Sequence, residues 1–182
     1  MGPAEFCPSK HLGFCKIADK CYARKPERYS KQCLSYRYRQ YNYWMSETAN
    51  GIAAQFSLLL RRMKAEIRYL RFNESGDFFG QDCVRKLSLL AEYLQKEHGI
   101  ITYGYSARKD LDFSGVHFLV KGSEHENGNN GKTVVLKKFE IKEYVSTLST
   151  SDKKSWKICS GSCKTCNMCM KPNNYNIIFP QH

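Results

Sequence analysis

The sequence has no apolar run long enough to cross a membrane. Apolar residues make up 42% of the 182-residue chain, but no stretch approaches the roughly 18 consecutive apolar residues that a membrane span needs. No apolar segment follows the first methionine either, so no secretory signal is evident. We therefore expect a cytoplasmic protein that does not contact a membrane.

Acidic residues are scarce relative to basic ones. The sequence also contains no evident internal repeat. Only 17 Asp and Glu stand against 29 Lys and Arg, which gives a net charge of +12. Such an excess favours an anionic partner, which could be nucleic acid, a nucleotide or an acidic protein, and the alternative is a basic surface with no specific partner. The length suits a single domain.

Cysteine, by contrast, is abundant, with nine residues in the chain. An odd number cannot be paired completely in disulfides, and a reducing compartment keeps thiols free. Clustered thiols in such a compartment indicate a metal site. Cys33 and Cys83 stand apart from the other seven, and we expect these two to be buried structural residues.

Four cysteines stand within eleven residues near the end of the chain: Cys159, Cys163, Cys166 and Cys169. Their spacings are x3, x2 and x2, and the C-x2-C-x2-C part matches the segment with which bacterial ferredoxins hold a cubane cluster. Gly161 permits the tight turns that such a site needs. We expect these four residues to bind a [4Fe-4S] cluster. Zinc is the alternative, although structural zinc sites usually use two separated C-x2-C pairs.

A second group of thiols lies near the start of the chain, at Cys7, Cys15 and Cys21. Their x7 and x5 spacings match no metal motif closely, so we rank them as second-tier ligands. A site of three thiols would leave one iron of a cubane open to another ligand. Alternatively, one of the three could complete a cluster that is seated mainly on the C-terminal run.

Hydrophobic periodicity predicts alternating helices and strands in the middle of the chain. Helices are expected over residues 47–65 and 82–97, and strands over 67–72, 100–105, 116–120 and 133–136. This order predicts an α/β fold, either a small partial (β/α) barrel or an open, mostly parallel sheet. We expect one domain over residues 7–170, with cysteine-rich segments at 7–33 and 159–170. Residues 149–182 are expected to be irregular.

Polar side chains follow two of the predicted strands. Glu74, Ser75 and Asp77 come after the strand at 67–72, and Ser106 and Arg108 come after the strand at 100–105. Because ligands of α/β folds bind at the carboxyl ends of strands, we expect these five residues to form a ligand-binding patch. The alternative is ordinary turn and helix-cap chemistry.

Basic residues alternate with tyrosines over residues 24–44. Such a pattern suits phosphate contacts combined with base stacking. The alternative is an amphipathic helix whose tyrosine rings pack on the core.

Several motifs together resemble the phage "gene product 88" domain family over about residues 7–170. They are Cys7-Pro8, the Cys21-Tyr22-Ala23 triplet, the stretch from Arg71 to Phe78 (RFNESGDF), and the C-terminal cysteine run. The resemblance implies a bacteriophage protein that works in the host-cell cytoplasm, in a family with no settled activity. The Cys21-Tyr22-Ala23 triplet also resembles the cluster-binding entry of radical S-adenosylmethionine enzymes. That weaker likeness implies S-adenosylmethionine as a further ligand, although those enzymes use C-x3-C-x2-C spacing.

These observations predict an iron–sulfur cluster-binding protein with a redox, regulatory or radical-S-adenosylmethionine-like role. The alternative function is a zinc-stapled, basic nucleic-acid-binding module.

Overall fold

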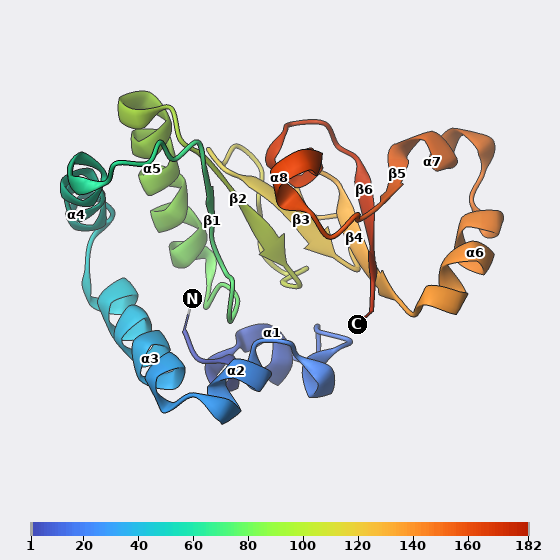
Figure 1. The fold of residues 1–182 in the computed structure, drawn as a ribbon, viewed down its shortest axis with the longest axis horizontal. Coiled ribbons are helices and arrows are strands. Elements are labelled where there is room, and N and C mark those ends of the chain that lie inside the picture. The colour runs from blue at the N-terminus through green and yellow to red at the C-terminus, as the bar shows by residue number, and fades with distance from the viewer. Residues whose placement is uncertain (1, 182) are drawn as a thin grey trace.

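A single open sheet of six parallel strands organises the structure, a computed structural model that describes residues 2–181 except for the side chains of Lys164 and Thr165 (Figure 1). The strand order is β1-β2-β3-β4-β6-β5. The strands are β1 (Tyr69–Arg71), β2 (Ile101–Ser106), β3 (Leu119–Ser123), β4 (Lys132–Leu136), β5 (Trp156–Ile158) and β6 (Asn176–Pro180). The prediction of an open parallel sheet in an α/β fold is confirmed, and the sheet does not close into a barrel.

Helices make up much of the rest of the described chain. They are α1 (Pro8–His11), α2 (Arg24–Tyr29), α3 (Lys31–Ser46), α4 (Ala49–Arg62), α5 (Gln81–His98), α6 (Lys138–Thr147), α7 (Thr150–Ser155) and α8 (Cys163–Cys166). Short 3-10 turns lie at η1 (Ala4–Phe6), η2 (Ala18–Lys20) and η3 (Met168–Met170). No helix in the described chain is long and apolar enough to cross a membrane.

The first crossover, β1–α5–β2, follows the pattern that the sequence predicted. Val84, Leu87, Ala91 and Leu94 form a buried stripe on α5 and join the main hydrophobic core. Gly99 ends the helix in the left-handed conformation, with φ of 65°, which glycine adopts without the steric cost of a Cβ. The crossover therefore covers one face of the sheet with apolar side chains.

The direction of the chain across the sheet reverses after β5. The connection from β4 to β5 passes through α6 and α7 and leaves a gap of one strand between them in the sheet. The chain then turns back, and β6 fills that gap between β4 and β5. Parallel crossovers are right-handed, so reversing the direction places the connection on the opposite face of the sheet. Residues 159–175, which connect β5 to β6 and contain the four C-terminal cysteines, therefore cross the face that α5 leaves uncovered. We call these residues the cysteine loop.

The alternation of side chains along the strands separates the two faces. Strand register places Leu70, Val120, Val134 and Ile178 on the face that packs against α5 and α6. The other face, which we call the loop face, carries Arg71, Tyr103, Tyr105, Lys121 and Thr133. The two faces of the sheet thus differ in chemistry: one is an apolar core, and the other carries tyrosines and basic side chains on β1 to β3 and apolar side chains, Ile177 and Phe179, on β6.

The C-terminal part of the chain corrects one prediction. Residues 149–182 were expected to be irregular, yet they contain α7, β5 and β6, and β6 pairs with both β4 and β5. The strand β5 has only three residues, and β6 ends in a proline, so neither gives a strong sequence pattern. The sheet thus includes residues beyond position 170, and η1 adds packed residues before position 7.

Residues 4–46 form a cap across the carboxyl edge of the sheet. Figure 1 shows α1 and α2, in blue, below the carboxyl ends of the strands. Ser9 bonds to Asp77, Lys16 pairs with Glu124, and Tyr22 bonds to the carbonyl of Glu74. The cap brings the N-terminal cysteines to the edge where ligands of α/β folds bind.

Candidate functional site

The cysteine loop folds into short turns that hold its four thiols on the loop face. The single turn of α8 places Cys163 and Cys166 three residues apart, so both lie on one side of it. Asn167 then takes a left-handed conformation, with φ of 53°, and leads into η3, which carries Cys169 and contacts β2. Cys163 is exposed, whereas the other three are half-buried.

A buried lysine lies beneath the cysteine loop. The side chain of Lys121 is 1% exposed, and its ammonium donates to the carbonyl oxygens of Asn130 and Tyr175. Burial lowers the pKa of Lys121 to about 8, because the charged form is poorly solvated there, and the nearby Cys169 counteracts this shift. Within the described chain, Lys121 forms no ion pair with Asp or Glu. The titratable group that acts on its ammonium is instead the thiol of Cys169.

Hydrogen-bond donors also face the sulfur atoms of the loop. The Tyr105 hydroxyl donates to Cys169, and the backbone N–H of Gly161 lies 3.4 Å from Cys159 Sγ. Burial raises the pKa of Cys169, while Tyr105 and Lys121 act to lower it. The charges of Cys159 and Cys166 also raise this pKa, so these three sulfurs lie within electrostatic range of one another.

The thiols are gathered but not closed around a common point. In the part of the chain that the structure describes, no three His, Cys, Asp or Glu side chains come together closely enough to form a ready metal site. Any metal or cluster would therefore have to draw the sulfurs inward on binding. The exposed position of Cys163 allows such a movement without disturbing the buried core.

The N-terminal cysteines lie in a different electrostatic environment, in the cap. Burial raises the pKa of Cys7 to about 11, and the negative charges of Asp77 and Cys15 add to this shift. Burial likewise raises the pKa of Cys15, and Cys21, Asp77 and Glu124 add to it. Arg108 lies within electrostatic range of Cys7, but burial and the negative charges leave the pKa of this thiol raised. Their environment therefore favours neutral thiols over thiolates.

Asp77 joins the cap to the sheet. Its side chain is almost fully buried and accepts hydrogen bonds from Ser9 Oγ at 2.6 Å, Ser106 Oγ at 2.7 Å and the backbone N–H of Ala107 at 2.8 Å. The backbone N–H of Phe78 donates to it as well, at 2.8 Å. Of the predicted ligand-binding patch, the structure thus brings Asp77 and Ser106 into direct contact.

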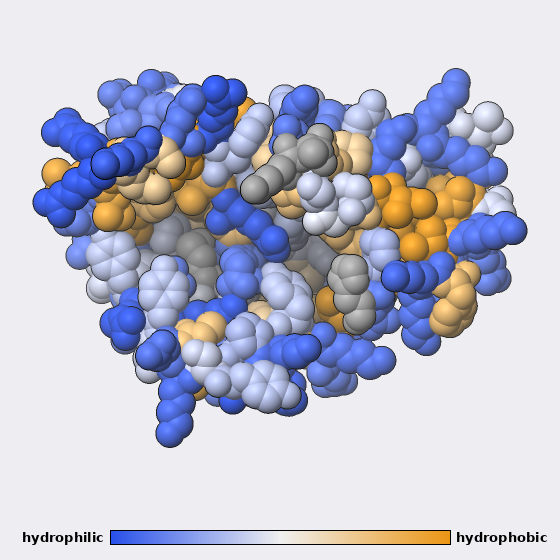
Figure 2. Space-filling model, in the orientation of Figure 1, coloured by the Kyte–Doolittle hydropathy of each residue, from blue (hydrophilic) through white to orange (hydrophobic). Residues whose placement is uncertain are grey.

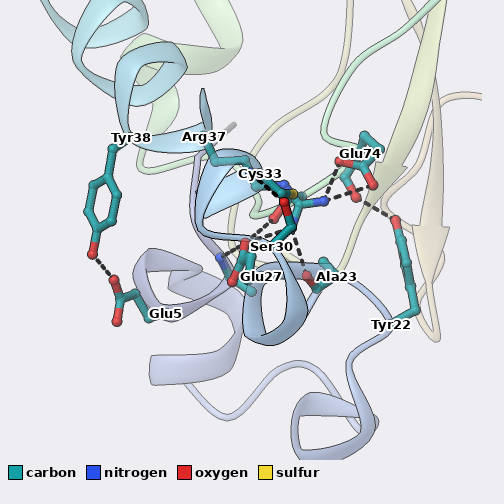
Figure 3. A network of polar contacts seen from close by, with 11 residues as sticks. Glu5, Tyr22, Ala23, Glu27, Ser30, Cys33, Arg37, Tyr38 and Glu74 are labelled. Atoms are coloured by element: carbon teal, nitrogen blue, oxygen red, sulfur yellow. Dashed lines mark hydrogen bonds and ion pairs between the residues drawn. The ribbon is translucent and has the colours of Figure 1, made fainter. Parts of the chain in front are cut away.

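Glu74 instead takes part in a network around a buried arginine (Figure 3), and Ser75 contacts a member of the same network. Arg37 is 4% exposed and donates to Glu27, to Glu74 and to the carbonyl oxygen of Ala23. Ser75 lies 3.4 Å from the same Glu27 oxygen. These contacts hold the cap against the end of β1.

Arg108, the last residue of the predicted patch, pairs with a neighbouring carboxylate. Its guanidinium makes two hydrogen bonds to Asp110, at 2.8 and 2.7 Å, and a further bond to the carbonyl of Phe78. All five predicted residues thus make internal bonds at the carboxyl edge. Whether the patch also binds a ligand stays a prediction.

Arg71 connects the two groups of cysteines. Its guanidinium lies 5.0 Å from the centre of the Tyr105 ring and donates to the Tyr22 hydroxyl at 3.1 Å. Tyr22 follows Cys21, and Tyr105 bonds to Cys169.

The sequence analysis did not predict a functional role for Arg71, Tyr105 or Lys121. Charged and tyrosine side chains at alternate positions of a short strand are nevertheless a signal of a polar sheet face.

The family model named Gene product 88 matches residues 1–111, more than half of the chain. The chain belongs to the Gene product 88 family. The family's name as a phage gene product agrees with the bacteriophage origin expected from the sequence. No curated protein and no solved structure matched the chain.

The Gene product 88 match covers the cap, the N-terminal cysteines and the whole predicted ligand-binding patch, whereas the cysteine loop lies outside it. The likeness to radical S-adenosylmethionine enzymes is not shown by any of these comparisons. For this member of the Gene product 88 family, the metal ligands, cofactor and anionic partner stay predictions.

Proposed function

We propose that this protein binds an iron–sulfur cluster through Cys159, Cys163, Cys166 and Cys169. The observation that carries the proposal is that a loop with four closely spaced thiols crosses the sheet face that holds a buried ammonium, Lys121, and that one of those thiols, Cys169, lies within electrostatic range of it. The loop has the C-x2-C-x2-C spacing of ferredoxin segments. Its connection between two neighbouring strands holds both of its ends in place.

Charge balance supports an anionic group at this position. A buried cation without a counter-ion is costly, because the protein interior solvates charge poorly. A cluster held by four thiolates carries net negative charge, and it would lie beside Lys121 and Arg71 on the loop face. The two basic residues would stabilise that charge, while the Tyr105 hydroxyl and the Gly161 N–H would donate to ligand sulfurs. Hydrogen bonds to sulfur and local charge are the features that tune such clusters.

A redox or regulatory role follows most directly from this arrangement. We place the protein in the host-cell cytoplasm, where a reducing environment keeps the ligand thiols free. S-Adenosylmethionine binding would extend the role to radical chemistry, and the cluster is required before that extension can be tested. Zinc bound by the same four thiols is the alternative that the first experiment must separate.

We expect protein prepared anaerobically with ample iron to be brown and to contain iron and acid-labile sulfide in near-equal amounts. Sulfide analysis decides between the metals, because zinc-loaded protein is colourless and contains none. Stoichiometric zinc without sulfide, in cells supplied with iron, would show that the site is a zinc site. Protein with neither metal would refute a metal centre of either kind.

Removing the charge of Lys121 should change the cluster's redox behaviour. Reduction adds negative charge, which the nearby ammonium stabilises, so Lys121→Met should lower the reduction potential by roughly tens of millivolts. The matched control is Lys86→Met, because Lys86 also donates to a backbone carbonyl, that of Trp44, but lies on α5 across the sheet. Equal potentials in the two variants, measured by redox titration, would place the cluster away from Lys121.

A further inference from the structure

One face of α3 is exposed, and its chemistry differs from that of the packed face. On the packed side, Arg37 and Trp44 are buried. Tyr41 contacts Phe6 and Phe79, with ring centroids 5.1 and 5.2 Å apart. The expectation that tyrosines of this segment pack on the protein interior is thus met by part of the segment.

Two other tyrosines of α3 point away from the protein. Tyr36 is 54% exposed and Tyr43 is 41% exposed. They stand seven residues apart, so they lie two turns apart on one side of the helix, separated by roughly 10 Å along its axis. The amide of Gln40 donates to the Tyr36 hydroxyl at 2.9 Å and lies between them on the same side. Both rings therefore offer an open face to solvent.

The surroundings of these rings are largely basic, although the carboxylate of Glu47 lies within electrostatic range of Tyr43. The sixteen residues of α3 contain no Asp or Glu. Lys31 and Arg39 are exposed on the helix, and Arg28 is exposed on the preceding α2, next to Tyr29, which is 83% exposed. Figure 2 shows mostly hydrophilic side chains over α2 and α3, at the lower left. The buried Arg37 is neutralised by Glu27 and Glu74, so the unpaired charge of this segment lies on its outside.

We propose that the exposed face of α3 binds single-stranded nucleic acid. Tyr36 and Tyr43 would stack on bases, and Arg28, Lys31 and Arg39 would contact phosphates, which is the combination that single-strand binding surfaces use. The rise of roughly 10 Å along the helix between the two residues corresponds to about three stacked nucleotides. A net charge of +12 adds a long-range attraction for the strand.

This surface is separate from the cysteine loop. It lies on the outer side of the cap, whereas the cysteine loop connects β5 to β6 and lies on one face of the sheet (Figure 1). Nucleic-acid binding is therefore expected whether the thiols hold a cluster, zinc or nothing. The two proposals can fail independently.

The test measures binding of a labelled oligonucleotide of mixed sequence, as single strand and as duplex, by fluorescence anisotropy at low salt. Replacing both rings, with Tyr36→Ala and Tyr43→Ala together, should weaken single-strand binding by roughly 10- to 100-fold. The matched variant with Tyr36→Phe and Tyr43→Phe keeps both rings and should bind within about twofold of the original protein. Phe139→Ala, which removes an aromatic side chain that is 74% exposed on α6, should have no effect.

Two further comparisons complete the test: affinity as a function of salt concentration, and affinity for single strand against duplex. Affinity should fall steeply with added salt, because phosphate contacts release counterions. Absence of single-strand binding at low salt would overturn the proposal. It would also be overturned by equal affinity for duplex, or by equal binding of the Ala and Phe variants, since either result removes base stacking. Circular dichroism of each variant confirms that α3 remains folded.

Discussion

Cys169→Ala should remove most of the iron from the protein, by about tenfold relative to the unmodified chain, whereas Cys15→Ala should leave iron binding largely intact. The measurement is iron and sulfide content per chain after anaerobic reconstitution. The two residues have comparable burial, since both are half-buried. Their different positions in the fold, rather than their accessibility, lead to the opposite expectations.

Electrostatics is the physical reason for this contrast. A cysteine binds metal as the thiolate, so neighbouring charge decides how readily it becomes a ligand. Burial raises the pKa of both thiols, and at Cys169 the hydrogen bond from Tyr105 and the ammonium of Lys121 act against this rise. Cys15 lies near Asp77 and Glu124, and both act to raise its pKa. The four cysteines of the loop also need no closure of a long chain segment to meet.

Cys83→Ala is the control for a nonspecific loss of stability. Cys83 lies on α5, partly buried against the main hydrophobic core, on the side of the sheet away from the loop. Its replacement should lower stability modestly and leave iron content unchanged. If iron is lost with Cys15→Ala or Cys21→Ala but retained with Cys159→Ala, the ligand set is wrong, and the cluster joins the cap to the loop across Arg71.

The regular part of the fold could be predicted because its apolar pattern is long. The stripe on α5 repeats over 18 residues and ends at Gly99, so both the helix and its end are visible in the sequence. The strands β5 and β6 escaped prediction because each has only a short apolar run, Trp156 and Ile158 in β5 and Ile177 to Phe179 in β6, within a polar, cysteine-rich segment. Their positions in the sheet depend on the pairing of β6 with β4 and of β5 with β6, which a local pattern does not contain.

The candidate site was visible in part for a similar reason. Cysteine spacing is local, so the C-terminal run could be singled out, and strand ends could be named from their neighbours. The partners of these residues are not local. Asp77 bonds to Ser9, 68 positions away in the chain, and Tyr22 bonds to Glu74, 52 positions away. The sequence therefore indicated the residues at the carboxyl edge of the sheet, but it did not indicate the cap whose side chains bond to them.

Asp77→Ala should lower the free energy of unfolding by about 3–5 kcal/mol. The substitution leaves four donors without their acceptor, and two of them, the hydroxyls of Ser9 and Ser106, belong to residues that are 1% exposed. Each buried donor left unpaired costs about 1–3 kcal/mol. Because these bonds join the cap to the sheet, residues 4–46 should also become more sensitive to protease. Urea denaturation and limited proteolysis measure the two effects.

Asp112→Ala is the matched control, because Asp112 also accepts bonds from a backbone N–H and a hydroxyl, both of Ser114, but is exposed to water. Its loss should cost less than about 1 kcal/mol, since water replaces the missing acceptor. Asp77→Asn gives a second, independent readout. It removes a negative charge that raises the pKa of both Cys7 and Cys15, so these two thiols should react faster with an alkylating reagent near neutral pH. Unchanged unfolding energy in Asp77→Ala, together with unchanged thiol reactivity in Asp77→Asn, would show that Asp77 does not hold the cap, and that the N-terminal cysteines are positioned by other contacts.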